Sequence, residues 1–275
     1  MKTQWRQLNP LSHSGFLLVD GAGAGEDILI DMGFHGESLD AALRGHGSRL
    51  DRVAHLLVTH VDRDHLTMEV AAEMAAGGTE VIIGAEAWSQ VGDRPGRRAL
   101  EESGKLQLIT AAGAGAVADH SLVWATFPHG LPNMAFRIGD QLFSGDTPVT
   151  ALMNTEDPDA ADLLGLEGGC TRGLWINTAQ RSRADIHSIA EELGARRVQN
   201  YLNNHGIAED VVMAMDEPAL RDFFAGLEVI VPHHLRRVPL AETAHWIRGE
   251  LTKARDRHGF TFRIEFPGAA LVNEM

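Results

Sequence analysis

Four side chains of the types that bind metal ions crowd one short stretch of the chain, "HLLVTHVDRDHLT" at residues 55–67. They are His60, Asp62, Asp64 and His65, and they follow directly on a short apolar run. Neutral imidazoles and carboxylates suit zinc, manganese and iron. Residues so close together in the sequence cannot surround an ion from all sides, so a metal site at this turn needs partners from elsewhere in the chain.

Candidate partners follow three later segments that are predicted to be strands. His129 comes after "VWATFP", Asp146 after "LFSG" and His205 after "VQNYLNN". Loops at strand ends are free of the sheet's hydrogen bonds while the sheet holds them in place, and functional side chains gather there. Each of these residues alone has an ordinary explanation, such as a surface histidine or a turn-forming aspartate. Their joint occurrence favours one shared site.

The elements expected to position these residues alternate between strands and helices. In the first half, strands are predicted at 16–19 and 28–31, joined by a glycine-rich reversal, and a further buried strand leads into His60. From residue 122, three short strands with turn residues between them predict a second, antiparallel-rich sheet. The glycine- and alanine-rich segment 111–118 is expected to be a flexible loop. Helices interspersed with strands in both halves predict two packed sheets covered by helices.

The composition narrows the function classes. The chain has 275 residues, 44% of them hydrophobic, which is enough for a full core. Its formal net charge of −14 opposes association with nucleic acid or anionic lipid. The single cysteine, Cys170, excludes an internal disulfide, and the first residues contain no apolar segment of the signal-peptide type, so a cytoplasmic protein is expected. No apolar run approaches the ~20 residues that cross a bilayer.

Taken together, these stretches resemble the signature of the metallo-β-lactamase-fold hydrolases. That signature is T-H-x-H-x-D-H after a strand, then a histidine, then an aspartate in an S-G-D-T turn, and a final histidine. The stretches "THVDRDH", "FPHGLPNMAFRIGDQLFSGDT" and "NNHG" match it in order. His129 lies 64 residues after His65, and Asp146 lies 17 residues after His129. His205 lies 59 residues after Asp146, and the resemblance, which also includes the early "ILIDMG", spans roughly residues 10–240.

The resemblance implies an α/β fold, a four-layer αββα sandwich that spans residues 1–275 as a single domain. It also implies two divalent metal ions at one edge of the sheets, with zinc as the first expectation and manganese or iron as alternatives. A hydroxide bridging the ions would cleave an ester-like bond, with a phosphodiester or a lactone as the expected substrate. Asp64 would also orient the attacking water, so Asp64 and Asp146 are the expected catalytic residues. Carried over position by position, the ligands are His60, Asp62 and His129 for one ion, Asp64, His65 and His205 for the other, and Asp146 between them.

Asp62 departs from the family pattern, which has a histidine at this position. With Asp62 as a ligand, the first ion would have two imidazoles and two carboxylates, a harder and more negative set that shifts preference from zinc towards manganese or iron. The flavodiiron-type members of the fold carry a carboxylate here, usually glutamate, and bind iron. An oxygen-using di-iron redox enzyme is therefore the alternative function. A binding or regulatory module with an inactive site is a third.

The last ligand also has rivals. His233 and His234 follow the segment "EVIV", which is predicted to be a strand, and they lie 87 and 88 residues beyond Asp146. The spacing of His205 is nearer to that of the family, so His205 is the preferred ligand. His233 or His234 could instead donate a proton to the substrate or lie on the surface.

The partner that the resemblance implies is a small-molecule substrate. The net negative charge argues against nucleic acid, and no membrane partner is expected. A monomer and a homodimer both stay open.

Overall fold

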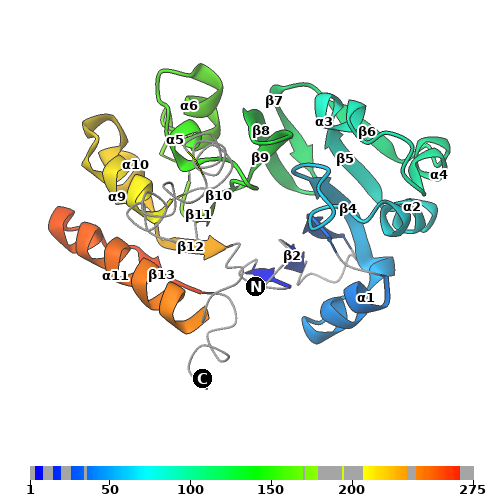
Figure 1. Cartoon of the computed structure of the whole chain (residues 1–275), viewed down its shortest axis with the longest axis horizontal. Coiled ribbons are helices and arrows are strands. Elements are labelled where there is room, and N and C mark those ends of the chain that lie inside the picture. Colours follow the sequence, from blue (N-terminus) through cyan, green and yellow to red (C-terminus); the bar gives the residue numbers. More distant parts are fainter. Residues whose placement is uncertain are drawn as a thin grey trace. The chain divides into compact units, whose positions relative to one another are not determined.

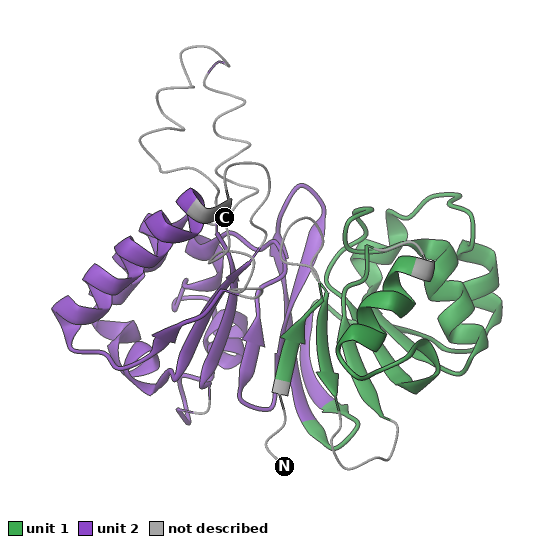
Figure 2. Ribbon diagram, turned by 90° about the horizontal axis from the view of Figure 1, so that it is seen from below, with its two compact units in different colours: residues 1–111, 116–120 green, residues 112–115, 121–275 purple. Residues whose placement is uncertain are grey.

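The computed structural model of the chain forms two compact units, drawn in different colours in Figure 2. Unit 1 comprises Met1–Ala111 and Ala116–His120, and unit 2 comprises Ala112–Gly115 and Ser121–Met275. Each unit is built around one β-sheet with helices beside it (Figure 1). The structure describes residues 4–8, 15–19, 26–33, 36–169, 171–178, 194, 207–233 and 240–266.

The sheet of unit 1 has its strands in the order of the sequence, from β1 to β6. The first three strands are antiparallel, and β3 to β6 are parallel. All of β3 and the last three residues of β4 are buried. Strands of a parallel sheet are covered on both faces, which explains why these strands are nearly continuous apolar runs. The strands are β1 (Gln4–Gln7), β2 (Phe16–Val19), β3 (Asp27–Ile30), β4 (Val53–Val58), β5 (Glu80–Gly84) and β6 (Leu106–Ile109).

The helices of unit 1 connect its parallel strands, as parallel neighbours require. One helix follows β3, one follows β4 and two follow β5. The helix after β4 begins two residues beyond Leu66 and buries Met68, Val70 and Met74, so the residues between strand and helix form a short, fixed turn. The helices are α1 (Gly36–Gly45), α2 (Met68–Ala76), α3 (Ala85–Ser89) and α4 (Arg97–Glu102), with a 3-10 turn at Leu50–Arg52.

The sheet of unit 2 has the strand order β13-β12-β11-β10-β9-β8-β7. Strands β8, β9 and β10 pair antiparallel, and β10 to β13 pair parallel. The predicted antiparallel sheet after residue 122 is therefore correct for its first part. The strands are β7 (Ala112–Val117), β8 (His120–Pro128), β9 (Pro132–Ile138), β10 (Gln141–Phe143), β11 (Gly173–Asn177), β12 (Val229–His233) and β13 (Arg263–Ile264).

The core of unit 2 lies between this sheet and the helices beside it. Alternate strand residues such as Leu142, Leu174 and Ile230 are fully buried and pack with residues of α9 and α11, including Val211 and Leu251. No described helix, including the 19-residue α11, is both long and apolar enough to cross a membrane. The helices are α5 (Val149–Leu152), α6 (Pro158–Leu164), α9 (Ala208–Asp216), α10 (Arg221–Gly226) and α11 (Leu240–His258), with a 3-10 turn at Pro218–Leu220.

The segment 111–118, expected to be a flexible loop, is instead the edge strand β7. Its glycines are explained by Trp124 of β8, whose ring lies against this strand. A Cβ atom on Gly113 would lie 2.6 Å from the Trp124 ring, and one on Gly115 would lie 3.5 Å from it. The small residues therefore make room for an aromatic side chain and do not mark a loop.

Two other differences concern the later part of the chain. The sequence pattern gave no helix over 208–216, where the structure has α9. The predicted helix "RADIHSIAEELG" and the predicted strand "RRVQNYLNNHG" lie outside the described residues, apart from Gly194. Each unit supplies one sheet and one group of helices, and the predicted α/β class with two helix-covered sheets is correct.

Candidate metal centre

The carboxyl ends of β3 and β4 carry two buried polar residues that tie the strands together. The strands are parallel neighbours, so Asp31 and Thr59, which follow them, emerge at the same edge of the sheet. The backbone N–H and the hydroxyl of Thr59 both donate to the Asp31 carboxylate, at 2.7 Å each. Asp31 adopts a φ of +57°, in the left-handed region that aspartate tolerates better than most residues. This tie lies at the start of the ligand-rich turn.

Hydrogen bonds to this pair orient the rings of His60 and His65. Nδ1 of His65 lies 2.9 Å from Oδ2 of Asp31, and Nδ1 of His60 lies 3.1 Å from Oγ1 of Thr59. A carboxylate only accepts, so His65 carries its proton on Nδ1. The Thr59 hydroxyl gives its proton to Asp31, so it accepts from Nδ1 of His60. Each neutral ring then has its lone pair on Nε2, which is the form of imidazole that binds a metal ion.

The two carboxylates of the turn lie on the Nε2 sides of these rings. Oδ2 of Asp62 is 3.5 Å from Nε2 of His60, and Oδ2 of Asp64 is 3.8 Å from Nε2 of His65. The ring centroids are 3.9 Å apart, so the four side chains form one group, the unit 1 cluster. The side chain of Asp62 is shorter than the glutamate that flavodiiron-type proteins carry at this position, but it still reaches the side of His60 on which a metal ion would bind. Two imidazole nitrogens and two carboxylates fit zinc, manganese or iron.

Backbone contacts with the loop after β3 fix the turn that carries the cluster. The N–H of Met32 donates to the carbonyl of His65 at 2.8 Å, and the N–H of Thr67 donates to the carbonyl of Met32 at 3.2 Å. Gly33 lies so close to Asp64 that a Cβ atom on it would be 2.1 Å from the Asp64 carbonyl oxygen. Only glycine fits at this position.

His129 and Asp146 meet at one edge of the unit 2 sheet and form the unit 2 pair. β8 and β10 are both antiparallel to β9, so the two strands run in the same direction and end at the same edge. His129 directly follows β8, and Asp146 is the third residue after β10. Nε2 of His129 lies 3.7 Å from Oδ2 of Asp146, and both side chains are at least nine-tenths buried. The structure thus places these two candidate ligands side by side, and their binding of a metal ion stays a prediction.

Asn133 holds the turn of Asp146 in place. Its Oδ1 accepts from the backbone N–H of Asp146 at 3.0 Å. Its Nδ2 donates to the carbonyl of Ser144 at 3.0 Å and to the hydroxyl of Thr147 at 2.6 Å. The side chain of Asn133 is fully buried, and three hydrogen bonds satisfy most of its capacity. The position of Asp146 is therefore set by a neighbouring strand as well as by its own.

Of the three candidates for the last ligand, the structure describes only His233. His205 and His234 lie outside the described residues. His233 is the last residue of β12 and is fully buried, and it pairs in register with Asn177 of β11. The burial of His233 excludes the alternative that it is a surface residue. His233 therefore stays a candidate for the last ligand or for a residue that contacts substrate.

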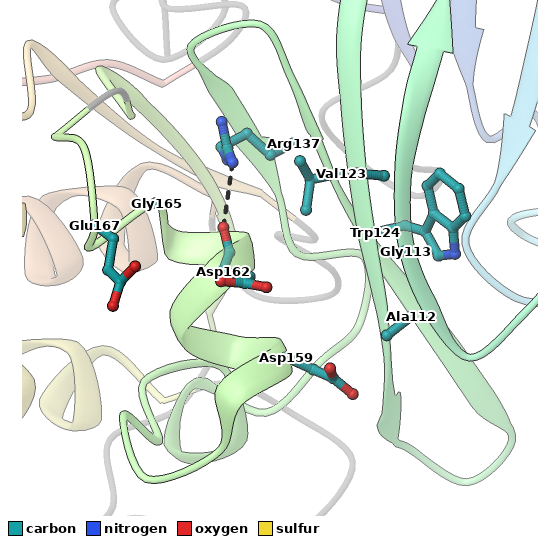
Figure 3. A pocket seen from close by; sticks show the side chains of 10 residues that line it. Ala112, Gly113, Val123, Trp124, Arg137, Asp159, Asp162, Gly165 and Glu167 are labelled. Carbon is teal, nitrogen blue, oxygen red and sulfur yellow. Dashed lines mark hydrogen bonds between the residues drawn. The ribbon is translucent and has the colours of Figure 1, made fainter.

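A cavity of about 450 Å³ elsewhere in unit 2 is a poor candidate for the reaction site (Figure 3). It lies between β7, β8 and β9 on one side and α6 on the other, and none of the described ligand candidates lines it. Its one cationic side chain, Arg137, is committed to the backbone, because it donates to the carbonyls of Asp162 and Leu163. The exposed carboxylates Asp159 and Glu167 complete an open, acidic hollow.

Sequence reasoning missed the residues that orient the ligands. Asp31 lies in the stretch "ILIDMG" of the resemblance, but neither it nor Thr59 or Asn133 belongs to the expected ligand set. The available signal was the same for all three: a polar residue that interrupts or ends an apolar run. Such residues are buried with their strands, and buried polar groups require hydrogen-bond partners.

Asp31→Asn should lower the affinity for metal about 10- to 100-fold, the usual cost of losing a partner that orients a ligand. Asparagine tolerates the positive φ, so the backbone stays in place. Its amide is neutral and itself donates, so it cannot accept from Thr59 and His65 as the carboxylate does. Competition with a chelator measures the affinity, and thermal unfolding of the metal-free protein measures the stability.

Asp27→Asn is the matched control for this change. Asp27 is a second fully buried aspartate, at the other end of β3, where it binds the Ser48 hydroxyl and lies 3.5 Å from Nε of Arg52. The control should lower the melting temperature and leave the metal affinity unchanged. Equal losses of metal affinity in the two variants would contradict a specific role of Asp31.

The sequence matches no protein-family model and none of the curated proteins. Solved structures do match. The metallo-β-lactamase fold protein YhfI from Bacillus subtilis is 12% identical, with a TM-score of 0.56 over 93% of this chain and 88% of its own.

Two further structures match over nearly the whole of this chain. Igni18, a metallo hydrolase from Ignicoccus hospitalis, is 15% identical, with a TM-score of 0.55 over 96% of this chain and 95% of its own. CmlA, a diiron β-hydroxylase from Streptomyces venezuelae, is 14% identical, with a TM-score of 0.55 over 94% of this chain and 52% of its own. At such identities the likeness concerns the fold. The chain therefore has the metallo-β-lactamase fold that its sequence motifs predict.

Proposed function

We propose that the chain is a dinuclear metal-dependent hydrolase of a small ester-like substrate. The observation that carries the proposal is the shared orientation of His60 and His65. Asp31 and Thr59 bind Nδ1 of the two rings, and this leaves both Nε2 lone pairs beside the carboxylates of Asp62 and Asp64. Burying and orienting two imidazoles next to two carboxylates is favourable when a cation completes the group.

In this proposal the unit 1 cluster and the unit 2 pair bind two divalent ions together, and the two units act as a single domain. The fold match and the order of the sequence motifs support this assignment. His205 is the last ligand by its spacing, and His233 is the alternative by its burial at a strand end. The proposed ligands are His60, Asp62 and His129 for one ion, Asp64, His65 and the last histidine for the other, and Asp146 between them.

The protein's own groups would position the substrate and the proton. A pair of divalent ions supplies Lewis acidity and a nucleophile derived from water at neutral pH. Asp64 is about one-fifth exposed, whereas His60 and His65 are fully buried, so this carboxylate can reach an attacking water and accept its proton. Asp31 and Asn133 act at a distance from the substrate, because they hold His65 and the backbone of Asp146 in place.

A di-iron redox enzyme is the second candidate function. It is favoured by the carboxylate of Asp62, which lies 3.5 Å from Nε2 of His60 where the hydrolase pattern has a histidine. The structural likeness to a diiron β-hydroxylase, CmlA, is compatible with it. A carboxylate-rich ligand set suits iron or manganese better than an imidazole-rich one.

Metal loading and turnover test the proposed function. The protein loaded separately with zinc, manganese and iron should bind two ions per chain and hydrolyse bis-p-nitrophenyl phosphate or one of a panel of lactones. His60→Ala should lower the metal content and the turnover. His55→Ala is its control, because His55 lies five residues earlier on β4 and contacts Glu80 outside the cluster.

Two results would count against hydrolysis. A protein that binds no metal, or that binds it equally well without His60, would exclude a metal site at this turn. An oxygen-dependent absorption change with iron, together with no turnover with redox-inert zinc, would favour the di-iron enzyme.

A further inference from the structure

Asn177 is a buried polar residue whose Nδ2 group has no hydrogen-bond partner among the residues that the structure describes. It is the last residue of β11, between β10 and β12, and is 1% exposed. Its backbone N–H donates to the Ser144 hydroxyl at 3.0 Å, but no described residue accepts from Nδ2. The hydroxyl of the next residue, Thr178, is also buried and has no partner among these residues. Such groups are rare in folded proteins because each one costs the free energy of its lost hydration.

The strand register shows which face of the sheet carries this amide. Leu174 and Ile176 pack into the core beside the helices. Successive strand residues point to opposite faces, so Trp175 and Asn177 lie on the face away from those helices. The ring of Trp175 stacks on that of Phe143 with centroids 5.4 Å apart, as residues on one face should. His233 of β12 is in register with Asn177 and shares this face.

A continuous chain of hydrogen bonds connects Asn177 with Asp146 at the same edge of the sheet. The Asn177 N–H donates to the hydroxyl of Ser144, and the carbonyl of Ser144 accepts from Nδ2 of Asn133. Oδ1 of Asn133 in turn accepts from the N–H of Asp146. The two asparagines differ in one respect. The side-chain oxygen and nitrogen of Asn133 both have partners, whereas Nδ2 of Asn177 has none within the described part of the chain.

We propose that Asn177 is a specificity-determining residue that donates from Nδ2 to a negatively charged oxygen of the substrate. The inference rests on the proposed function and narrows its substrate to a phosphodiester. A lactone has a single carbonyl oxygen, which the ions would polarise. A phosphodiester has a second non-bridging oxygen that still needs a donor, and an uncharged amide provides one between Asp146 and His233. A charge-assisted hydrogen bond of this kind is stronger than one between neutral groups.

The stability of the metal-free protein tests whether Nδ2 of Asn177 is unpaired. Asn177→Leu replaces the amide with an apolar group of similar size, so it should raise the melting temperature by about 2–4 °C. Asn133→Leu is the matched control at a buried asparagine whose side-chain oxygen and nitrogen both have partners, and it should lower the melting temperature by at least as much. A clear loss of stability in Asn177→Leu would overturn the proposal, because it would give Asn177 a structural role.

Binding of inorganic phosphate to the metal-loaded protein tests the ligand. Calorimetry should show binding by the wild type and an affinity about tenfold lower in both Asn177→Leu and Asn177→Asp, since neither side chain can donate. The metal content of these variants should equal that of the wild type. Unchanged phosphate affinity in the variants would overturn the role of Asn177 and leave the hydrolase proposal standing. Metal-loaded wild type that binds no phosphate but hydrolyses a lactone would likewise overturn it, whereas absence of metal binding would be a failure of the proposed function itself.

Discussion

Gly33→Ala should abolish metal binding without changing any ligand. A Cβ atom on residue 33 would lie 2.1 Å from the carbonyl oxygen of Asp64 and 2.4 Å from its Cα atom. These are backbone atoms, so no rotation of a side chain can relieve the overlap. The turn that carries Asp64 and His65 has to move, or the loop after β3 has to separate from it.

Either movement breaks the same contacts. Met32, next to Gly33, accepts from Thr67 and donates to His65, and these two bonds join the loop to both sides of the cluster. A displacement of about 1 Å is enough to spoil the geometry of a site of this kind. We expect stoichiometric metal binding to fall below detection and the free energy of unfolding to fall by about 1–3 kcal/mol, the usual cost of overpacking. Metal analysis after gel filtration and denaturant unfolding measure the two effects.

Gly45→Ala is the matched control for this variant. Gly45 is the last residue of α1 in the same unit, and a Cβ atom on it would meet nothing within 4 Å. Alanine is favoured over glycine in a helix by roughly 0.5–1 kcal/mol, so this control should keep its metal and gain slightly in stability. Normal metal content in Gly33→Ala would show that the turn is adaptable and that the tight approach to Asp64 is not required.

The grouping of the candidate ligands that lie together in the sequence could be predicted, because their spacing alone places them in one turn. His60, Asp62, Asp64 and His65 needed no knowledge of the fold beyond a strand that ends before them. The sequence also predicted His129 and Asp146 as neighbours, and the antiparallel pairing of β8, β9 and β10 explains their proximity. The overall α/β class followed from the alternation of strands and helices.

The residues that support the ligands could not be predicted, because their roles depend on contacts between distant strands. Asp31 is 34 positions from His65, and a parallel neighbour is needed to bring the two together. Asn133 and Asn177 are both asparagines at the ends of apolar strands. Only the structure shows that the amide nitrogen of Asn133 is hydrogen-bonded and that the amide nitrogen of Asn177 has no partner among the described residues. The loop predicted at 111–118 was wrong for a similar reason, because its glycines make room for Trp124.

Asp146→Ala should lower turnover by at least about a thousandfold and remove one or both ions. In the proposed site Asp146 is the one carboxylate shared by the two ions, and loss of a single group that stabilises the transition state costs about 100- to 1,000-fold by itself. Loss of an ion removes the source of the nucleophile as well. Metal content per chain and the rate of phosphodiester or lactone hydrolysis measure the two effects.

The loss should not come from unfolding. The backbone N–H of residue 146 keeps its bond to Asn133 in this variant, and the substitution removes a carboxylate that is 3% exposed. Burial of a charge is unfavourable, so the metal-free variant should be as stable as the wild type or more stable. Metal ions that bind the folded wild type should raise its free energy of unfolding, by an amount that grows with the logarithm of the ion concentration divided by the dissociation constant. The variant should lose this stabilisation.

Asp140→Ala is the matched control, because it removes a carboxylate near β10 that is not part of the proposed site. Asp140 precedes the strand and Asp146 follows it, so the two lie at opposite ends of the same three residues. Asp140 is exposed, and its side chain accepts only from the neighbouring Gln141 among the bonds that the structure describes. The control should retain its metal and its turnover. If Asp146→Ala also retained both its metal and its turnover, Asp146 would not be a ligand that the two ions share, and the proposed ligand assignment would be wrong.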